Sequence, residues 1–154
     1  MAKPPGRSPA ALAVRLGHDF ARCDLLAEAL THPSAASRRH HSYERLEFLG
    51  DRVLGLVVAD MLIDAFPGEP EGDLALRHAA LVRREALSAV AGEFGLGDHL
   101  RLAPGEAEAG IRDNAAIQAD AMEAVIAALY LDGGLEAARR FIARYWARPM
   151  AEAT

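Results

Sequence analysis

Hydrophobic and polar residues are distributed most unusually along residues 44–62, which read E-R-L-E-F-L-G-D-R-V-L-G-L-V-V-A-D-M-L. At 3.6 residues per turn, the apolar side chains of this proline-free stretch nearly surround the helix axis. They are Leu46, Phe48, Leu49, Val53, Leu54, Leu56, Val57, Val58, Met61 and Leu62. A helix that is apolar on most sides is a buried helix. The pattern therefore predicts a central helix that begins after an N-cap at Ser42 and ends near Phe66.

Stretches with helical spacing also precede and follow this segment. We expect helices at residues 9–16, 22–30, 73–92, 113–131 and 135–148, separated by turns rich in glycine and proline. No strand pattern extends beyond three residues. The sequence therefore predicts an all-α fold.

Three carboxylates interrupt the apolar pattern of the central helix. Glu44, Glu47 and Asp51 are spaced i, i+3 and i+7, which places them on one side of the helix. Acidic groups on a helix built for burial are costly unless positive charge meets them. A solvated polar face is the alternative interpretation, but the apolar residues on either side leave little room for one.

A second acidic pair lies downstream, in the apolar stretch A-D-A-M-E-A-V-I-A-A-L-Y at 119–130. Asp120 and Glu123 are spaced i, i+3, and alone such a pair is as typical of surface polarity as of a site. If the two helices pack with their acids facing, the carboxylates repel, and proton uptake or a multivalent cation relieves the repulsion. Ligand sets made only of oxygen suit Mg²⁺ or Mn²⁺ rather than zinc.

Glycines and histidines add smaller predictions. Gly50 and Gly55 each lower helix propensity by about 1 kcal/mol relative to alanine, so we expect them to pack closely against another backbone. His32 is expected to cap a helix end rather than bind a ligand. Residues 38–41 (R-R-H-H) are expected to form an exposed loop, with a phosphate contact as the alternative.

Composition narrows the class of protein. A chain of 154 residues, 51% of them apolar and 25% charged, fits one domain with its own core. Uncharged apolar runs such as 53–59 are too short to cross a membrane, and the first residues lack the apolar centre of a signal peptide. The single cysteine, Cys23, permits no internal disulfide, so we expect a cytoplasmic protein. The net charge of −5 weighs against nucleic-acid binding, although a carboxylate metal site would bias that count.

The segment E-R-L-E-F-L-G-D at 44–51 resembles the signature of the ribonuclease III catalytic domain. Further matches in order and spacing are A-L-T-H-P-S at 29–34, E-G-D-L at 71–74, L-V-R-R-E-A-L at 81–87, L-R-L-A-P-G-E at 100–106 and A-D-A-M-E-A-V-I-A-A-L-Y-L-D-G-G at 119–134. The resemblance covers about residues 8–148. It implies an all-helical, homodimeric, Mg²⁺-dependent endonuclease of RNA processing, including rRNA and mRNA. Such enzymes cut double-stranded RNA and leave 5′-phosphate and 3′-hydroxyl ends.

The resemblance also implies roles for single residues. The metal ligands would be four carboxylates, namely Glu47, Asp51, Asp120 and Glu123. They would bind Mg²⁺, with Mn²⁺ as an expected substitute, and Asp51 and Glu123 would be the least replaceable in catalysis. Glu44 would lie nearer the RNA backbone as a substrate-binding residue. Phe48 would insert into a pocket of the partner subunit.

The chain departs from the family pattern in places. Arg52 stands where the family usually has Ser or Ala, and Ser42 where it often has Asn. Neither change removes an expected metal ligand, and the role of Arg52 is left open. We expect a flexible tail at residues 1–8, the catalytic domain at 9–148 and a tail at 149–154, without the basic double-stranded-RNA-binding domain of many relatives.

Other functions fit parts of the pattern. A helical Mg²⁺-dependent nucleotide pyrophosphatase also carries E-x-x-E and E-x-x-D stripes on packed helices. A non-catalytic relative that only binds double-stranded RNA is expected to have lost at least one of the acids, and all of them are present here. A ferritin-like di-iron site requires Glu-x-x-His pairs, which the sequence lacks.

Overall fold

The computed structural model describes residues 8–39, 41–106 and 110–152 and is all-α, as predicted. Its elements in chain order are α1 (Pro9–Leu16), α2 (Cys23–Ala29), the 3₁₀ turn η1 (Pro33–Ala35), α3 (Glu44–Ala65), α4 (Glu71–Val82), α5 (Arg84–Phe94), the 3₁₀ turns η2 (Leu96–His99) and η3 (Ile111–Asp113), and α6 (Ala115–Glu152). Across these ranges the only β pairing is an isolated parallel bridge between Thr31 and Arg101. None of the described helices is both long and apolar enough to cross a membrane.

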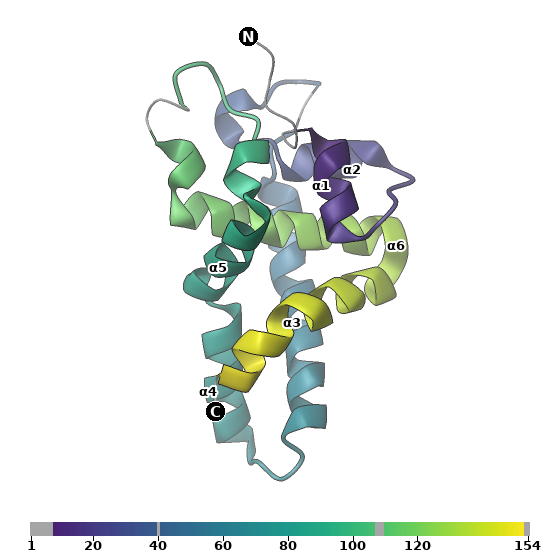
Figure 1. The fold of residues 1–154 in the computed structure, drawn as a ribbon, viewed down its shortest axis with the longest axis vertical. Coiled ribbons are helices and arrows are strands. Elements are labelled where there is room, and N and C mark those ends of the chain that lie inside the picture. Colours follow the sequence, from purple (N-terminus) through teal and green to yellow (C-terminus); the bar gives the residue numbers. More distant parts are fainter. Residues whose placement is uncertain (1–7, 40, 107–109, 153–154) are drawn as a thin grey trace.

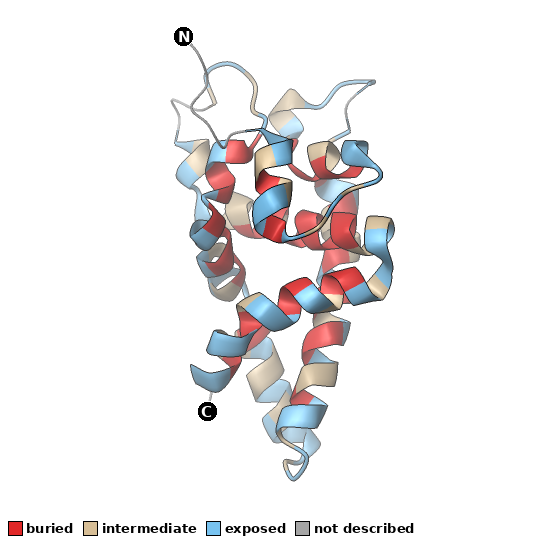
Figure 2. Ribbon diagram, turned by 45° about the vertical axis from the view of Figure 1, so that its right-hand side comes forward, coloured by how far each residue is buried: buried red, intermediate tan, exposed pale blue. Residues whose placement is uncertain are grey.

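The core forms where the first half of α6 crosses α3 (Figure 1). Both helices bury apolar side chains completely at this crossing, including Leu54, Val57, Val58, Met122, Val125 and Ile126. Small residues on α6, such as Ala124, Ala127 and Ala128, allow the two backbones to approach. Buried residues concentrate here, whereas the end formed by the α3–α4 connection is mostly exposed or intermediate (Figure 2).

Gly50 lies where the backbones of α3 and α6 are in direct contact. A Cβ atom built on Gly50 would lie 1.7 Å from the carbonyl oxygen of Glu123, so no side chain fits. The predicted close backbone packing is therefore confirmed for Gly50. It is wrong for Gly55, where a Cβ would meet only the His78 ring, at an ordinary 3.8 Å.

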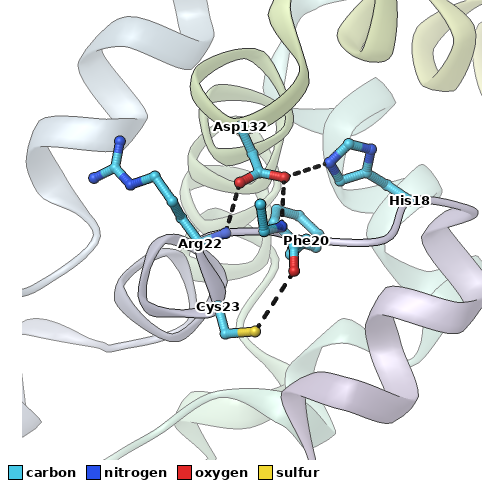
Figure 3. Close-up of polar contacts among 6 residues, drawn as sticks. His18, Phe20, Arg22, Cys23 and Asp132 are labelled. Atoms are coloured by element: carbon cyan, nitrogen blue, oxygen red, sulfur yellow. Dashed lines mark hydrogen bonds and ion pairs between the residues drawn. The ribbon is translucent and has the colours of Figure 1, made fainter.

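The two predicted helices at 113–131 and 135–148 form one element with a break at Gly134, whose φ of 76° and ψ of −178° are not helical. Just before the break, Asp132 accepts hydrogen bonds from the backbone N–H groups of Ala21 (3.1 Å) and Arg22 (2.8 Å). It also pairs with His18 Nε2 at 2.7 Å (Figure 3). A Cβ on Gly133 would lie 2.7 Å from His18 Cε1, so the glycine makes room for this ring.

The prediction of one continuous helix over residues 73–92 is wrong. The structure forms two helices there, α4 and α5, because the backbone of Arg83, with a ψ of 164°, is extended. The Leu81 carbonyl instead accepts a hydrogen bond of 2.8 Å from the buried indole N–H of Trp146. The donor lies on α6, 65 residues away, so the sequence around Arg83 could not predict this bond.

The ends of the domain differ slightly from the prediction. α6 continues to Glu152, so the prediction of a tail at 149–154 is wrong for residues 149–152. The helix extends beyond Pro149 because Met150 is buried against the core. Residues 1–7 of the expected N-terminal tail lie outside the described residues, as do 153–154. Ser8 caps α1 by accepting a hydrogen bond from the Ala11 N–H.

The predicted N-cap of the central helix is displaced by one residue. Tyr43, not Ser42, is the N-cap of α3 and makes no side-chain capping bond. Ser42 still contributes, because its hydroxyl accepts a hydrogen bond of 3.4 Å from the Glu44 N–H.

Candidate metal centre

Three acids from the two central helices meet at one point. Glu47 of α3 and Asp120 and Glu123 of α6 each offer a carboxylate oxygen, and these oxygens all lie within 4.8 Å of one another. The i, i+3 spacing places Asp120 and Glu123 on one face of α6. The contact between Gly50 and the Glu123 backbone then brings that face to Glu47, three residues before the glycine.

Glu123 lies deepest in the cluster, with 9% of its surface exposed. Of the four predicted ligands it is the only buried one, since Glu47 and Asp120 are half-buried and Asp51 is exposed. Burial raises the pKa of Glu123 to about 9, supported by a hydrogen bond with Asp51 and the charges of Asp51, Glu47 and Asp120. Without a cation, this carboxyl therefore holds a proton at neutral pH.

Glu47 and Asp120 share a second hydrogen bond. Burial, followed by the charge of Asp120 and the bond to it, raises the pKa of Glu47 to about 7. Burial also raises the pKa of Asp120, although the bond from Glu47 and the charge of Arg84 act in the opposite direction. The four acids therefore form two hydrogen-bonded pairs, each linking α3 to α6.

The donor set fits a hard divalent cation. Its three clustered groups are carboxylates, the ligand type of Mg²⁺ and Mn²⁺. The raised pKa values show that the cluster takes up protons when no cation neutralises it. Asp51 lies outside the 4.8 Å group and is exposed, but its bond to Glu123 places it at the edge of the same cluster.

The remaining predicted site residues lie on the exposed side of α3. Glu44 is exposed, accepts a hydrogen bond of 3.0 Å from the Ser42 hydroxyl, and contributes to the raised pKa of Glu47. Phe48 is 64% exposed. The guanidinium of Arg52 lies 3.9 Å from the centre of the Phe48 ring and donates to the Phe48 carbonyl at 3.1 Å. It also lies 3.5 Å from Asp51 Oδ2, so Arg52 pairs with an acid of the site.

His32 has the structural role predicted for it. Its Nδ1 accepts a hydrogen bond of 3.1 Å from the Ser34 N–H and caps η1. The loop containing Arg38 and Arg39 is exposed as predicted, and His40 lies outside the described residues. Arg39, His41 and Arg101 line a hollow of about 310 Å³, which also includes Asp24 and Glu28.

Two residues near the acids are missing from the sequence-based site. Tyr43 is buried, and burial together with the charges of Asp120, Glu47 and Glu44 raises the pKa of its hydroxyl. Arg84 acts on Asp120 by its charge. Tyr43 directly precedes the first acid, at i−4 from Glu47, and Arg84 lies in the matched segment 81–87. Those positions are the only sequence signals for either residue.

Fold and site together define an all-helical domain with a carboxylate cluster suited to a divalent cation. The family model described as "Ribonuclease-III-like" matches residues 23–150. Ribonuclease 3 of Azorhizobium caulinodans is 56% identical over 140 residues, which are 89% of this chain and 60% of that protein. Ribonuclease 3 of Mesorhizobium japonicum is 53% identical over 141 residues, 91% of this chain and 63% of the relative. The chain belongs to the ribonuclease III family.

Solved structures agree with this membership. The nuclease domain of ribonuclease III from Campylobacter jejuni superposes with a TM-score of 0.84 at 37% identity, covering 89% of this chain and 94% of that one. Dicer from Pichia stipitis superposes with a TM-score of 0.67 at 25% identity, over 88% of this chain and 59% of that protein. The chain spans about 60% of the length of the curated relatives named above.

Proposed function

We propose that this protein is a Mg²⁺-dependent endoribonuclease that cuts double-stranded RNA and leaves 5′-phosphate and 3′-hydroxyl ends. The observation that carries the proposal is the convergence of Glu47, Asp120 and Glu123 at the contact between α3 and α6. Membership of the ribonuclease III family supports the choice of substrate. The natural role would be rRNA and mRNA processing in the cytoplasm.

Glu47, Asp120 and Glu123 would hold the cation, and Asp51 would join them by turning from its hydrogen bond with Glu123. A bound Mg²⁺ supplies a more acidic water and positive charge beside the phosphate. Glu123 and Glu47 must give up their protons for the cation to bind, and Asp51 and Glu123 would orient the attacking water. No histidine base is required by this arrangement.

The substrate would approach from the exposed side of the cluster, where Glu44 lies at the start of α3. The major groove of an A-form RNA duplex is too narrow for side chains, so recognition would use phosphates and 2′-hydroxyl groups across the minor groove. Arg39 and Arg101, which line a hollow near the start of α3, are candidates for phosphate contacts.

A two-fold dimer would give each strand its own acidic cluster. Its interface would be the apolar stripe, by which we mean Phe48, Leu56 and Ile63 of α3. The α3 members are spaced 8 and 7 residues apart and therefore share one side of the helix. They are 64%, 56% and 59% exposed. Exposed apolar side chains gathered on one face are typical of a protein–protein contact.

The direct test is incubation of the purified protein with a long RNA duplex, with Mg²⁺ and with EDTA. We expect Mg²⁺-dependent shortening of the duplex and products that ligate through 5′-phosphate and 3′-hydroxyl ends. Binding of the duplex without cleavage would instead identify an RNA-binding relative. Hydrolysis of free nucleoside triphosphates in place of RNA would identify a pyrophosphatase, and either result would overturn the proposal.

A further inference from the structure

The starts of α3 and α6 are connected by a chain of hydrogen bonds that is separate from the Gly50 contact. On the α6 side, the Asn114 side chain caps the helix by accepting from the Ile117 N–H at 3.1 Å. One turn later, the Gln118 Nε2 donates to the Arg112 carbonyl at 2.6 Å. Gln118 is two residues before Asp120, so this bond fixes the first turns of the helix that presents that acid.

Arg112 continues the series of hydrogen bonds from α6 to residues 97–100. Its Nη1 donates to the carbonyls of Leu100 at 2.7 Å and Gly97 at 3.0 Å. A Cβ on Gly97 would lie 2.1 Å from the Arg112 carbonyl oxygen, so the two segments touch backbone to backbone. The half-buried guanidinium therefore holds the segment 97–100 against the start of α6.

Backbone bonds complete the path to α3. The Arg101 N–H donates to the Leu30 carbonyl at 2.7 Å, and the Arg101 carbonyl accepts from the His32 N–H at 3.0 Å. Next, the Tyr43 N–H donates to the Thr31 carbonyl at 2.9 Å. The Tyr43 carbonyl then accepts from the Glu47 N–H at 2.8 Å. We call this path, from Gln118 through Arg112 to Glu47, the loop belt; its connecting segments gather at the upper end of Figure 1.

The loop belt and the Gly50 contact support the acidic cluster at different places. Gly50 anchors Glu123 from the α3 side. The belt links the backbone of Glu47 to the turn just before Asp120, and these two acids form the outer hydrogen-bonded pair. Loss of the belt would therefore let Glu47 and Asp120 move apart while Glu123 stays in place.

We propose that Arg112 is a positioning residue that sets the spacing of Glu47 and Asp120 and thereby the affinity of the site for a divalent cation. The inference rests on the proposed metal site and adds a residue that touches neither the metal nor the RNA. Arginine suits the role because its planar fork presents donors in a fixed geometry. A lysine would supply charge but not that geometry.

The test compares Arg112→Met with Arg15→Met in the full chain. Arg15 also donates two bonds to backbone carbonyls, those of Phe94 at 2.6 Å and Glu93 at 2.9 Å, but at the end of α5. Mn²⁺ binding would be measured by electron paramagnetic resonance, thermal unfolding with EDTA, and duplex cleavage across a Mg²⁺ series. Partners that orient metal ligands typically contribute about 10- to 100-fold to affinity. We expect Arg112→Met to weaken Mn²⁺ binding by about tenfold and to recover turnover at high Mg²⁺, with Arg112→Lys between it and the wild type.

Arg15→Met is expected to lower the unfolding temperature but to keep the wild-type affinity for Mn²⁺. Wild-type Mn²⁺ affinity in Arg112→Met would overturn the inference and leave Arg112 a structural residue only. If Arg112→Met does not fold, Gln118→Met, which removes the neighbouring link, decides the question by the same comparison. Failure of the proposed metal site would be seen separately, as a wild-type protein that binds no Mn²⁺ at millimolar concentration, and would overturn both.

Discussion

Glu123 combines deep burial with an ionisable group, and the two properties conflict unless a proton or a cation is present. Its neighbours are other acids, so the nearest charges worsen the conflict. In the absence of a metal ion, Glu123 keeps its proton, and its hydrogen bond with Asp51 stabilises this protonated form. The residue is therefore poised to exchange a proton for a divalent cation.

Replacing Glu123 with glutamine keeps the size of the side chain and removes the anionic ligand. We expect the fold to persist and duplex cleavage to fall by at least about a hundredfold, since even outer partners of metal ligands contribute about 10- to 100-fold. Glu136→Gln, an exposed change on the same helix, is the control and should keep wild-type turnover. Near-normal cleavage by Glu123→Gln at millimolar Mg²⁺ would contradict the assignment.

Gly50 and Gly55 offer a matched pair of substitutions on α3. Gly50→Ala would place a Cβ 1.7 Å from the Glu123 carbonyl oxygen and force the helices apart. Overpacking ordinarily costs about 1–3 kcal/mol, and this backbone clash should reach or exceed the upper figure. Gly55→Ala meets nothing closer than 3.8 Å and should gain up to about 1 kcal/mol from helix propensity. Chemical unfolding of both variants checks the pair; equal stabilities would contradict the contact.

Sequence spacing was enough to select Glu47, Asp120 and Glu123, which the structure brings together, because positions i and i+3 share a helix face whatever the surroundings. It did not show that Asp51, at i+7 from Glu44, lies outside that group. It could not identify Tyr43 or Arg84, since both depend on an interaction across space with Asp120: the charge of Asp120 raises the pKa of Tyr43, and the charge of Arg84 lowers the pKa of Asp120. It also could not distinguish Gly50 from Gly55, because the identity of the residue opposite each glycine depends on how α6 crosses α3. The pattern predicts which residue types form the site, and the packing decides which of them meet.

The stability of the packing between α3 and α6 should depend on pH, because each helix contributes acids with raised pKa values. The pKa values of Glu123 (about 9) and Glu47 (about 7) lie above the ordinary 4.5, so the folded protein keeps protons that the unfolded chain releases. The metal-free protein should therefore lose stability as pH rises from about 4.5 to about 9. Unfolding with EDTA at pH 5, 7 and 9 would show the decline.

Saturating Mg²⁺ should reduce that decline, because the cation replaces the protons and stabilises the state that binds it. The Glu123→Gln variant should also show a shallower dependence in EDTA, having lost the group with the largest shift. Stability that rises with pH in the metal-free wild type would contradict the shared protons.

Element boundaries were predictable where local chemistry decides them and not elsewhere. Gly17 ends α1 in the left-handed conformation, as its position after a helical stretch predicts. The division between α4 and α5 has no glycine or proline, and a bond from Trp146 to the Leu81 carbonyl accompanies it. Met150 likewise extends α6 past Pro149 through a contact with the core.

At the scale of the whole molecule, the apolar stripe predicts dimerisation. Burying one Phe contributes roughly 1.5–3 kcal/mol, and two-fold symmetry doubles it. Phe48→Ala should therefore weaken the dimer by roughly 3–6 kcal/mol, about two to four decades in dissociation constant. Val14→Ala, at an exposed apolar residue of α1, is the control. Sedimentation at a series of concentrations measures both, and a wild type that is monomeric at micromolar concentration would refute the interface.

The bonds between Asp132 and residues 18–22 show that the family model and the fold place the start of the domain differently. The family match begins at residue 23, yet the partners of Asp132 are His18, Ala21 and Arg22. A chain that begins at residue 23 would retain every acid of the cluster but would lose the hydrogen-bond donors to Asp132. Those donors hold the pKa of Asp132 below its usual range, although burial acts to raise it. It would also lose Leu12 and Leu16 from the core. The smallest unit that folds stably is therefore longer than the segment that the family model matches, and it should begin no later than Ser8, the cap of α1.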